Sequence, residues 1–349
     1  MTLPNLATEK MIEFLCGLLN TPSPTGMADA GIAFTEQALA AVPGISMRRT
    51  RKGALVAVIP GQRSDAPRAL TAHCDTLGGM VKEIKPNGRL KLTQIGGFAW
   101  NTVENEGCTI FTASGKTVRG SLLVNTASAH VYRMAVTETK REDANMEVRL
   151  DARTTNGDET RALGIQVGDF VAFDPRVEVV NGFVRSRHLD DKACVACVVA
   201  AVQALADAGL KPVQTTYLHI SNYEEVGHGA SAGIPAEVTE LLTVDMAAVG
   251  DGQTSNEYQT SLCVKDSGGP YHHGLSNRLR QLADEHQIPY VVDVYPFYGS
   301  DGEAFWRAGG DVAVALIGPG VDASHGYERT HTDALEATAR WVMAYLLGE

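Results

Sequence analysis

Histidines and acidic residues occur at the ends of several short apolar segments of this chain. His73 and Asp75 lie at the end of a strand expected over residues 69–74. Residues of the same types recur further along, at Asp190, Asp191, Glu224, Glu225, Asp245 and His325. In open α/β folds, active sites form beyond the carboxyl ends of the strands. Imidazole and carboxylate groups are the ligands that hold zinc, cobalt or manganese, so the pattern predicts a divalent-metal site.

Each of these groups also has an ordinary structural explanation when taken alone. His73 and Asp75 could form a simple hydrogen-bonded pair, and His325 could lie exposed in a loop. Asp190 and Asp191 could cap a helix and favour its dipole, and Glu224 could belong to a solvated turn with its neighbour. The joint pattern favours a metal site, because a bound cation offsets the repulsion within an acidic cluster. We therefore expect a metal-dependent hydrolase.

The elements that must position these residues form an α/β pattern in two pieces, residues 1–76 and 182–349. Apolar periodicity predicts helices and strands that alternate along both pieces. The helices are expected over residues 11–19, 28–41, 191–208, 275–286 and 335–347, and the strands over residues 45–50, 54–59, 69–74, 215–220, 241–245, 290–294 and 312–317.

Residues 77–181 differ, because short β-prone runs between turn signals replace the helical spacing. These runs lie at residues 80–84, 118–124, 146–150, 170–173 and 177–180. About a hundred residues of this kind predict a small inserted β-barrel or sandwich.

The composition excludes several classes of function. The 349 residues contain 30 Lys and Arg against 41 Asp and Glu, a formal charge of −11, which repels a phosphate backbone and excludes general nucleic-acid binding. No apolar run approaches the ~18 residues of a membrane span, and the first residues are not expected to form a signal peptide. The six cysteines are few and scattered, so we expect a cytoplasmic protein without a disulfide framework.

Five ordered motifs resemble the M42 metallo-aminopeptidases, the family of the glutamyl and deblocking aminopeptidases. The resemblance runs essentially from end to end of the chain. The motifs are Ala72-His73-Cys74-Asp75, Leu189-Asp190-Asp191-Lys192, Glu224-Glu225-Val226-Gly227, Val244-Asp245 and Ser324-His325-Gly326-Tyr327-Glu328. The resemblance implies a three-layer α/β/α metallopeptidase domain with an inserted small β-barrel domain.

The same resemblance implies a role for each site residue. One metal ion would be held by His73, Asp190 and Asp245, and a second by Asp190, Glu225 and His325, with Asp190 bridging the two. Zinc is the expected metal, with cobalt and manganese as alternatives.

Catalysis would be carried by two further carboxylates. Glu224 would be the general base, and Asp75 would orient His73. Glu224 and its neighbour Glu225 can serve different roles only if the chain turns there, which Gly227 and Gly229 permit.

The sequence departs from the family pattern at two positions close to proposed metal ligands. Lys192 stands where the family usually has Arg, and the last motif differs around His325. His331 is a second imidazole nearby and an alternative ligand. The stretch from His325 to His331 is similar to an M42 branch associated with N-acetylglutaminylglutamine amide osmoprotectant gene clusters.

The expected function is removal of the N-terminal residue from short peptides. Hydrolysis of an acylated or amidated dipeptide is an alternative, and a catalytically silent scaffold is an alternative of another class. A glycosidase is disfavoured, because three Trp offer little material for a sugar platform. The resemblance also implies a homo-oligomer built from dimers, up to a dodecamer, in which residues 77–181 mediate assembly and substrate access.

Overall fold

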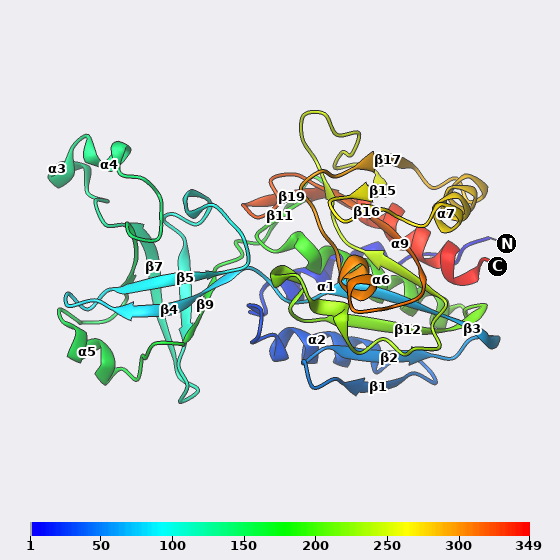
Figure 1. Cartoon of the computed structure of the whole chain (residues 1–349), viewed down its shortest axis with the longest axis horizontal. Helices are drawn as coiled ribbons and strands as arrows, with labels where there is room; N and C mark the ends of the chain where they lie inside the picture. Colours follow the sequence, from blue (N-terminus) through cyan, green and yellow to red (C-terminus); the bar gives the residue numbers. More distant parts are fainter. Residues whose placement is uncertain (1) are drawn as a thin grey trace. The chain divides into compact units, whose positions relative to one another are not determined.

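The computed structural model describes residues 2–349, which divide into two compact units (Figure 1). The first unit comprises the residues up to Asp75 together with Arg176–Glu349, and the second is Thr76–Pro175. Among residues 2–349, no helix is both long enough and apolar enough to cross a membrane.

The first unit contains a ten-stranded mixed sheet. Eight strands follow one another in the order β1-β2-β12-β3-β13-β18-β15-β16, while β14 pairs with β18 and β17 pairs with β15. The strands are β1 (Ser46–Arg49), β2 (Leu55–Ile59), β3 (Arg63–His73), β12 (Gln214–Ser221), β13 (Glu240–Val244), β14 (Ala247–Ala248), β15 (Thr260–Asp266), β16 (Gly269–Pro270), β17 (Tyr290–Val294) and β18 (Ala313–Val321).

Four neighbouring strands at the centre of this sheet, β12, β3, β13 and β18, run parallel. Their carboxyl ends therefore meet at one edge of the sheet, where ligand sites form in α/β folds. The strands are rich in buried apolar residues, as expected for a parallel sheet that is covered on both faces.

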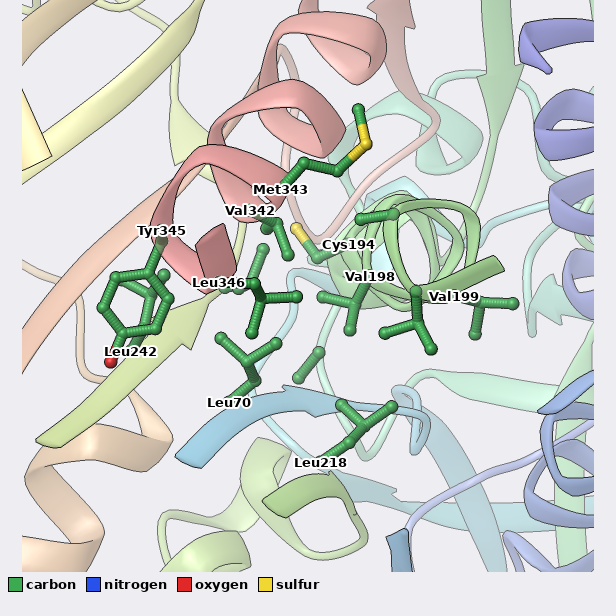
Figure 2. Close-up of a cluster of buried hydrophobic side chains, with 14 of the residues drawn as sticks. Leu70, Cys194, Val198, Val199, Leu218, Leu242, Val342, Met343, Tyr345 and Leu346 are labelled. Carbon is green, nitrogen blue, oxygen red and sulfur yellow. The ribbon is translucent and has the colours of Figure 1, made fainter. Parts of the chain in front are cut away.

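Helices and their apolar side chains cover the sheet. The helices of this unit are α1 (Thr8–Leu19), α2 (Asp29–Leu39), α6 (Leu189–Asp207), α7 (His273–Glu285), α8 (Asp301–Arg307) and α9 (Thr332–Leu347), with short 3-10 turns η2 (Glu224–Val226) and η3 (Gly229–Ser231). On one face, Val198 of α6 and Leu346 of α9 pack with Leu70 of β3 (Figure 2). On the other face, Phe305 of α8 packs with Ala69 of β3. Consecutive strand residues point to opposite faces, so one strand contributes to both cores.

A separate three-stranded sheet belongs to the same unit. It joins β10 (Glu178–Val180), β11 (Phe183–Ser186) and β19 (Glu328–His331) in antiparallel pairs. Residues 176–181 were predicted to belong to the insert, whereas the structure places them in the first unit. The reason is long-range pairing, because β10 pairs with β11 and β11 pairs with β19 near the end of the chain.

The second unit is a closed six-stranded barrel in the order β4-β5-β8-β7-β6-β9, with its own apolar core. Its elements are β4 (Gly78–Ile84), β5 (Leu90–Ile95), η1 (Trp100–Thr102), β6 (Gly107–Phe111), β7 (Thr117–Val124), α3 (Ala129–Tyr132), α4 (Ala135–Glu138), β8 (Met146–Leu150), α5 (Gly157–Ala162) and β9 (Phe170–Phe173). The predicted fold class, an α/β domain with an inserted small β-barrel, is confirmed.

Candidate active site

Three parallel strands bring the first candidate residues to one edge of the sheet. Strand β3 ends at His73, β13 ends immediately before Asp245, and β12 ends at Ser221, which pairs with His73 in the sheet register. The turn that carries Glu224 and Glu225 follows β12 directly. Residues that lie 172 positions apart in the sequence thus meet because the strands share a direction.

Asp190, at the start of α6, lies between two imidazoles. Its Oδ1 is 3.0 Å from Nε2 of His73, and its Oδ2 is 3.4 Å from Nε2 of His325. Nε2 of His325 is also 3.7 Å from Oε2 of Glu225. Burial favours the neutral form of Asp190, but the contacts with His325 and His73 outweigh burial and lower its pKa. The carboxylate of Asp190 therefore faces two separate groups of ligand atoms, one through each oxygen.

The donor set fits divalent cations. Ligand atoms of His73, Asp190 and Asp245 all lie within 4.8 Å of one another, and all three residues are buried. Burial and the charge of Asp190 raise the pKa of Asp245 to about 7 and raise that of Glu225 well above its usual range. Buried carboxylates that repel one another to this degree are stabilised by a bound cation.

Glu224 and Glu225 lie in a tight turn, as the sequence analysis required. Tyr223 and Gly227, on either side of η2, both adopt left-handed backbone angles, with φ of 78° and 85°. Oε2 of Glu224 lies 3.7 Å from Nε2 of His73, whereas Glu225 faces His325. The turn thus directs two adjacent carboxylates to two different imidazoles.

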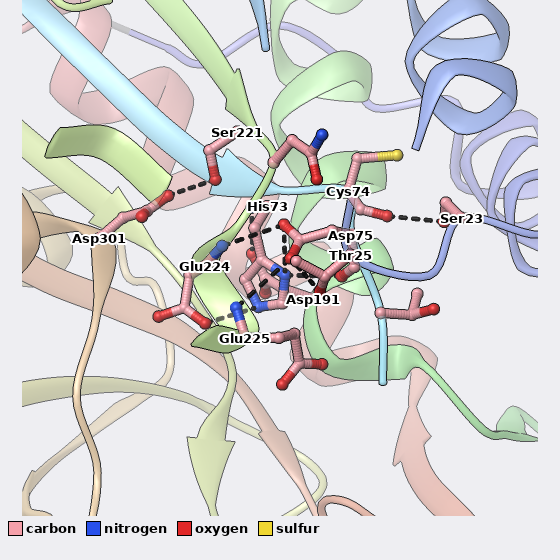
Figure 3. Close-up of polar contacts among 12 residues, drawn as sticks. Ser23, Thr25, His73, Cys74, Asp75, Asp191, Ser221, Glu224, Glu225 and Asp301 are labelled. Atoms are coloured by element: carbon pink, nitrogen blue, oxygen red, sulfur yellow. Dashed lines mark hydrogen bonds and ion pairs between the residues drawn. The ribbon is translucent and has the colours of Figure 1, made fainter. Parts of the chain in front are cut away.

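Asp75 is fully buried and holds this turn in place (Figure 3). Its carboxylate accepts hydrogen bonds from the main-chain N–H groups of Glu224 and Glu225, at 3.2 and 3.4 Å, and from Oγ1 of Thr25 at 2.7 Å. Nδ1 of His73 is 2.9 Å from the main-chain carbonyl of Asp75 and 3.8 Å from its carboxylate. The Asp75 main chain therefore orients His73, and the Asp75 side chain orients the glutamate turn.

The loop after β18 brings His325 to the site, and Glu328 anchors it. The two carboxylate oxygens of Glu328 accept hydrogen bonds from the main-chain N–H groups of Asp190 and His325, at 3.1 and 2.9 Å. His331, the alternative ligand, lies instead on β19, where its ring packs edge-on against Phe183 at 4.9 Å. The structure thus places His325 beside Asp190, and His331 in an aromatic cluster.

These residues open onto a cavity of about 640 Å³ in the first unit. Asp190, Glu224 and His325 line one part of it, and the remainder is formed mainly by the segment that precedes α8 and by α8 itself. The lining residues in that part include Tyr295, Pro296, Phe297, Tyr298, Gly299, Ser300, Glu303, Ala304 and Arg307.

Further residues organise the candidate site. Asp301 accepts hydrogen bonds from Ser221 and from the main-chain N–H of Ala230, and so ties β12 to η3 (Figure 3). The hydroxyl of Tyr298 is buried and, among residues 2–349, has no hydrogen-bond partner of normal geometry. Asp301 lies in the Ser300-Asp301-Gly302 segment, which is similar to an M42 loop near the substrate and in this structure begins α8. No local pattern distinguishes Tyr298.

Buried lysine is a further feature of the site's surroundings. Lys192 is fully buried in α6, and its ammonium donates hydrogen bonds to the carbonyls of Leu18 and Thr21 at 3.0 and 2.7 Å. These carbonyls lie at the end of α1 and just beyond it, where a positive charge is favourable. Lys192 therefore anchors α1 to the helix that begins with Asp190.

Comparisons with known proteins agree with this geometry. Residues 53–341 match the model of the M42 glutamyl aminopeptidase family. YhfE of Bacillus subtilis (strain 168), named as an aminopeptidase, is 47% identical over 341 residues, which cover 97% of this chain and 98% of YhfE.

Solved structures show the same fold. The TET aminopeptidase from the marine sediment archaeon Thaumarchaeota archaeon SCGC AB-539-E09 superimposes with a TM-score of 0.87 at 18% identity, covering 97% of this chain and 96% of that one. The TET1 peptidase of Pyrococcus horikoshii, which can assemble into a tetrahedron or a large octahedral shell, has a TM-score of 0.83 at 19% identity, covering 97% of this chain and all of that one. With its sequence matched over most of its length, the chain belongs to the M42 family of glutamyl aminopeptidases and is a peptidase.

Proposed function

We propose that the chain removes the N-terminal residue of short peptides at a centre of two divalent metal ions, with zinc as the expected metal. The observation that carries the proposal is the position of Asp190, whose two oxygens face His73 and His325 separately. A bridging carboxylate is a common means of holding two cations about 3.5–4 Å apart. Asp245 would complete the site of His73, and Glu225 would complete the site of His325.

The residues around this centre divide the chemistry between them. The two metal ions supply Lewis acidity and lower the pKa of a bound water. Glu224, which lines the cavity, accepts a proton from the attacking water and returns it to the leaving amine as the C–N bond breaks. The water oxygen bonds to the carbonyl carbon, so the products are a free amino acid and a shortened peptide. Asp75 positions Glu224 through the main chain.

The test combines a variant with a substrate panel. Glu224→Gln keeps the shape of the side chain but removes its basicity, so kcat should fall by about 10²–10⁴ while the bound metal is retained. The panel pairs peptides that have a free N-terminus with the same peptides N-acetylated, and only the free forms should be cleaved. Cleavage of the blocked forms alone would replace the proposal with hydrolysis of an acylated or amidated dipeptide. Full hydrolytic activity in Glu224→Gln would remove Glu224 from the role of general base, and a metal-loaded wild type that cleaves neither form would favour a silent scaffold.

We also propose that the chain forms a homo-oligomer through residues 77–181. The support is that the Pyrococcus horikoshii relative can assemble into a tetrahedron or a large octahedral shell, together with apolar side chains exposed on the barrel unit. Val131, Tyr132 and Met134, which lie within four residues of one another, are 68%, 44% and 65% exposed, and contiguous exposed apolar surface marks interaction sites. Light scattering should give a mass above that of a monomer, and a monomer at every concentration would contradict this proposal.

A cytoplasmic location is part of the same proposal. All six cysteines lie in the part of the chain that the structure describes, and all are free thiols, five of them buried. Free thiols of this kind are typical of a reducing compartment.

A further inference from the structure

The loop that carries His325 connects β18 to β19 and is closed at its base. The main chains of Asp322 and Arg329 exchange two hydrogen bonds, of 2.9 and 3.1 Å. Between these residues, Ala323 and His325 adopt left-handed backbone angles, with φ of 57° and 63°. Residues other than glycine rarely adopt such angles, which cost free energy and persist only where neighbouring contacts hold the chain. The position of His325 therefore depends on the contacts that hold this loop.

Two contacts hold the main chain of the loop from the side of the site. Glu328 accepts the main-chain N–H of His325 at 2.9 Å, and the carbonyl of Gly326 accepts Nη1 of Arg187 at 3.2 Å. The imidazole of His325 itself is 40% exposed, and its Nε2 lies 3.4 and 3.7 Å from the two carboxylates of its proposed metal site. Because both contacts reach only the main chain, a shift of the loop would move the imidazole away from these carboxylates.

Tyr327 supplies a third contact, to a distant part of the same unit. Its hydroxyl donates a hydrogen bond to the main-chain carbonyl of Arg176 at 2.9 Å. The guanidinium of Arg176 lies over the ring of Tyr327, 4.2 Å from its centroid, where a cation is attracted by the aromatic face. Gly326 separates Tyr327 from His325, and glycine is the most flexible residue type. Fixing Tyr327 therefore limits the conformations that the chain can adopt at Gly326, and so limits the movement of His325.

The position of these residues identifies what the contact does. Within the proposed two-metal function, we infer that Arg176 and Tyr327 form a clamp that holds His325 beside the carboxylates of its site and thereby sets the affinity of that site for metal. Tyr327 is a positioning residue, because it acts through His325. A site that is correctly assembled for only a fraction of the time binds its ligand with an affinity reduced by that fraction. Loss of the clamp should therefore weaken the site of His325 and leave the site of His73 unchanged.

The experiment measures the binding of zinc by competition with a chromophoric chelator, and follows the ion that His325→Ala loses. Tyr327→Phe keeps the ring and removes the hydrogen bond, so the Kd of this ion should rise about two- to tenfold. Arg176→Met removes the charge over the ring but keeps the main-chain carbonyl, so the Kd should rise about two- to fivefold. Tyr217→Phe is the matched control, because it removes a hydroxyl that donates to Glu237 at 2.8 Å in an exposed position. The control should bind zinc as wild type does.

A double variant shows whether Tyr327 acts through His325. In His325→Ala, the addition of Tyr327→Phe should change the binding of zinc no further. A further loss of zinc in the double variant would show that Tyr327 supports the fold as a whole, and would overturn the clamp. Excess zinc should refill the weakened site, so kcat of Tyr327→Phe should return to within about twofold of wild type. A kcat that stays low with two ions bound would also contradict the clamp.

The outcomes separate this inference from the function on which it rests. A wild-type chain that binds fewer than two zinc ions would overturn the two-metal proposal, and the clamp with it. Two ions in the wild type, with the same Kd in Tyr327→Phe and Arg176→Met, would overturn the clamp alone. Equal weakening in Tyr217→Phe would assign the effect to a general loss of stability, which would also overturn the clamp.

Discussion

Substitution of Asp75 by asparagine tests how the glutamate turn is held. The carboxylate accepts main-chain N–H groups through both oxygens, from Glu224 at 3.2 Å and from Glu225 at 3.4 Å, and it also accepts Oγ1 of Thr25. Asparagine has one acceptor oxygen, so its NH₂ group must face one of these donors. A hydrogen bond to a charged group contributes ~1.5–3 kcal/mol, and a buried donor without an acceptor costs ~1–3 kcal/mol. The free energy of unfolding should therefore fall by about 3–5 kcal/mol.

The effect on catalysis follows from the displacement of Glu224. A catalytic group that moves by ~1 Å can lose about 100-fold in rate, so kcat of Asp75→Asn should fall by about this factor. The assay is steady-state hydrolysis of a free-amine peptide, together with the midpoint of denaturation and metal content by mass spectrometry. Asp158→Asn is the control, because it removes the same charge from a side chain that is 97% exposed. The reasoning would be refuted if Asp75→Asn kept a kcat within threefold of wild type and unfolded at the same denaturation midpoint as Asp158→Asn.

Two further predictions concern other histidines. His325→Ala should lose one of two bound metal ions by mass spectrometry and most of its activity, whereas His331→Ala should retain both, and the reverse result would assign the ligand to His331. Burial lowers the pKa of His219 to about 4, from its usual value of about 6.5. The unfolded chain therefore takes up a proton more readily than the folded one as the pH falls from 6.5 toward 4, and stability is lost in that window. Between pH 7.5 and 4.5, denaturant titrations should show that wild type loses about 2–3 kcal/mol more than His219→Gln, and equal losses would show that His219 does not titrate in this way.

Many of the candidate site residues could be placed near one another from the sequence, because they lie at the ends of regular elements. His73 ends an apolar strand, and Asp245 directly follows another. Asp190 lies at the start of an alanine- and valine-rich helix. Local patterns are therefore enough to place these three residues at the ends of elements. The parallel direction of the central strands then brings these ends together. The turn at Glu224 was expected because the different roles implied for Glu224 and Glu225 require one and Gly227 and Gly229 permit it. In the structure Gly227 adopts a left-handed φ of 85°.

The remaining features depend on contacts between distant segments, which no local pattern reveals. The assignment of residues 176–181 was wrong because β10 pairs with β11, and β11 pairs with β19 about 150 residues away. Helix α8, with Glu303, is only seven residues long and carries too short a pattern to predict. The role of the Asp75 side chain was predicted only in part, because its hydrogen bonds run to a main chain 149 residues away.

The most direct test of the two-metal proposal is the number of divalent metal ions per chain, measured by mass spectrometry alongside hydrolysis of a free-amine peptide. The proposal predicts about two ions per chain, loss of hydrolysis on chelation and recovery when zinc, cobalt or manganese is returned. Hydrolysis that continues unchanged after complete removal of metal would contradict it.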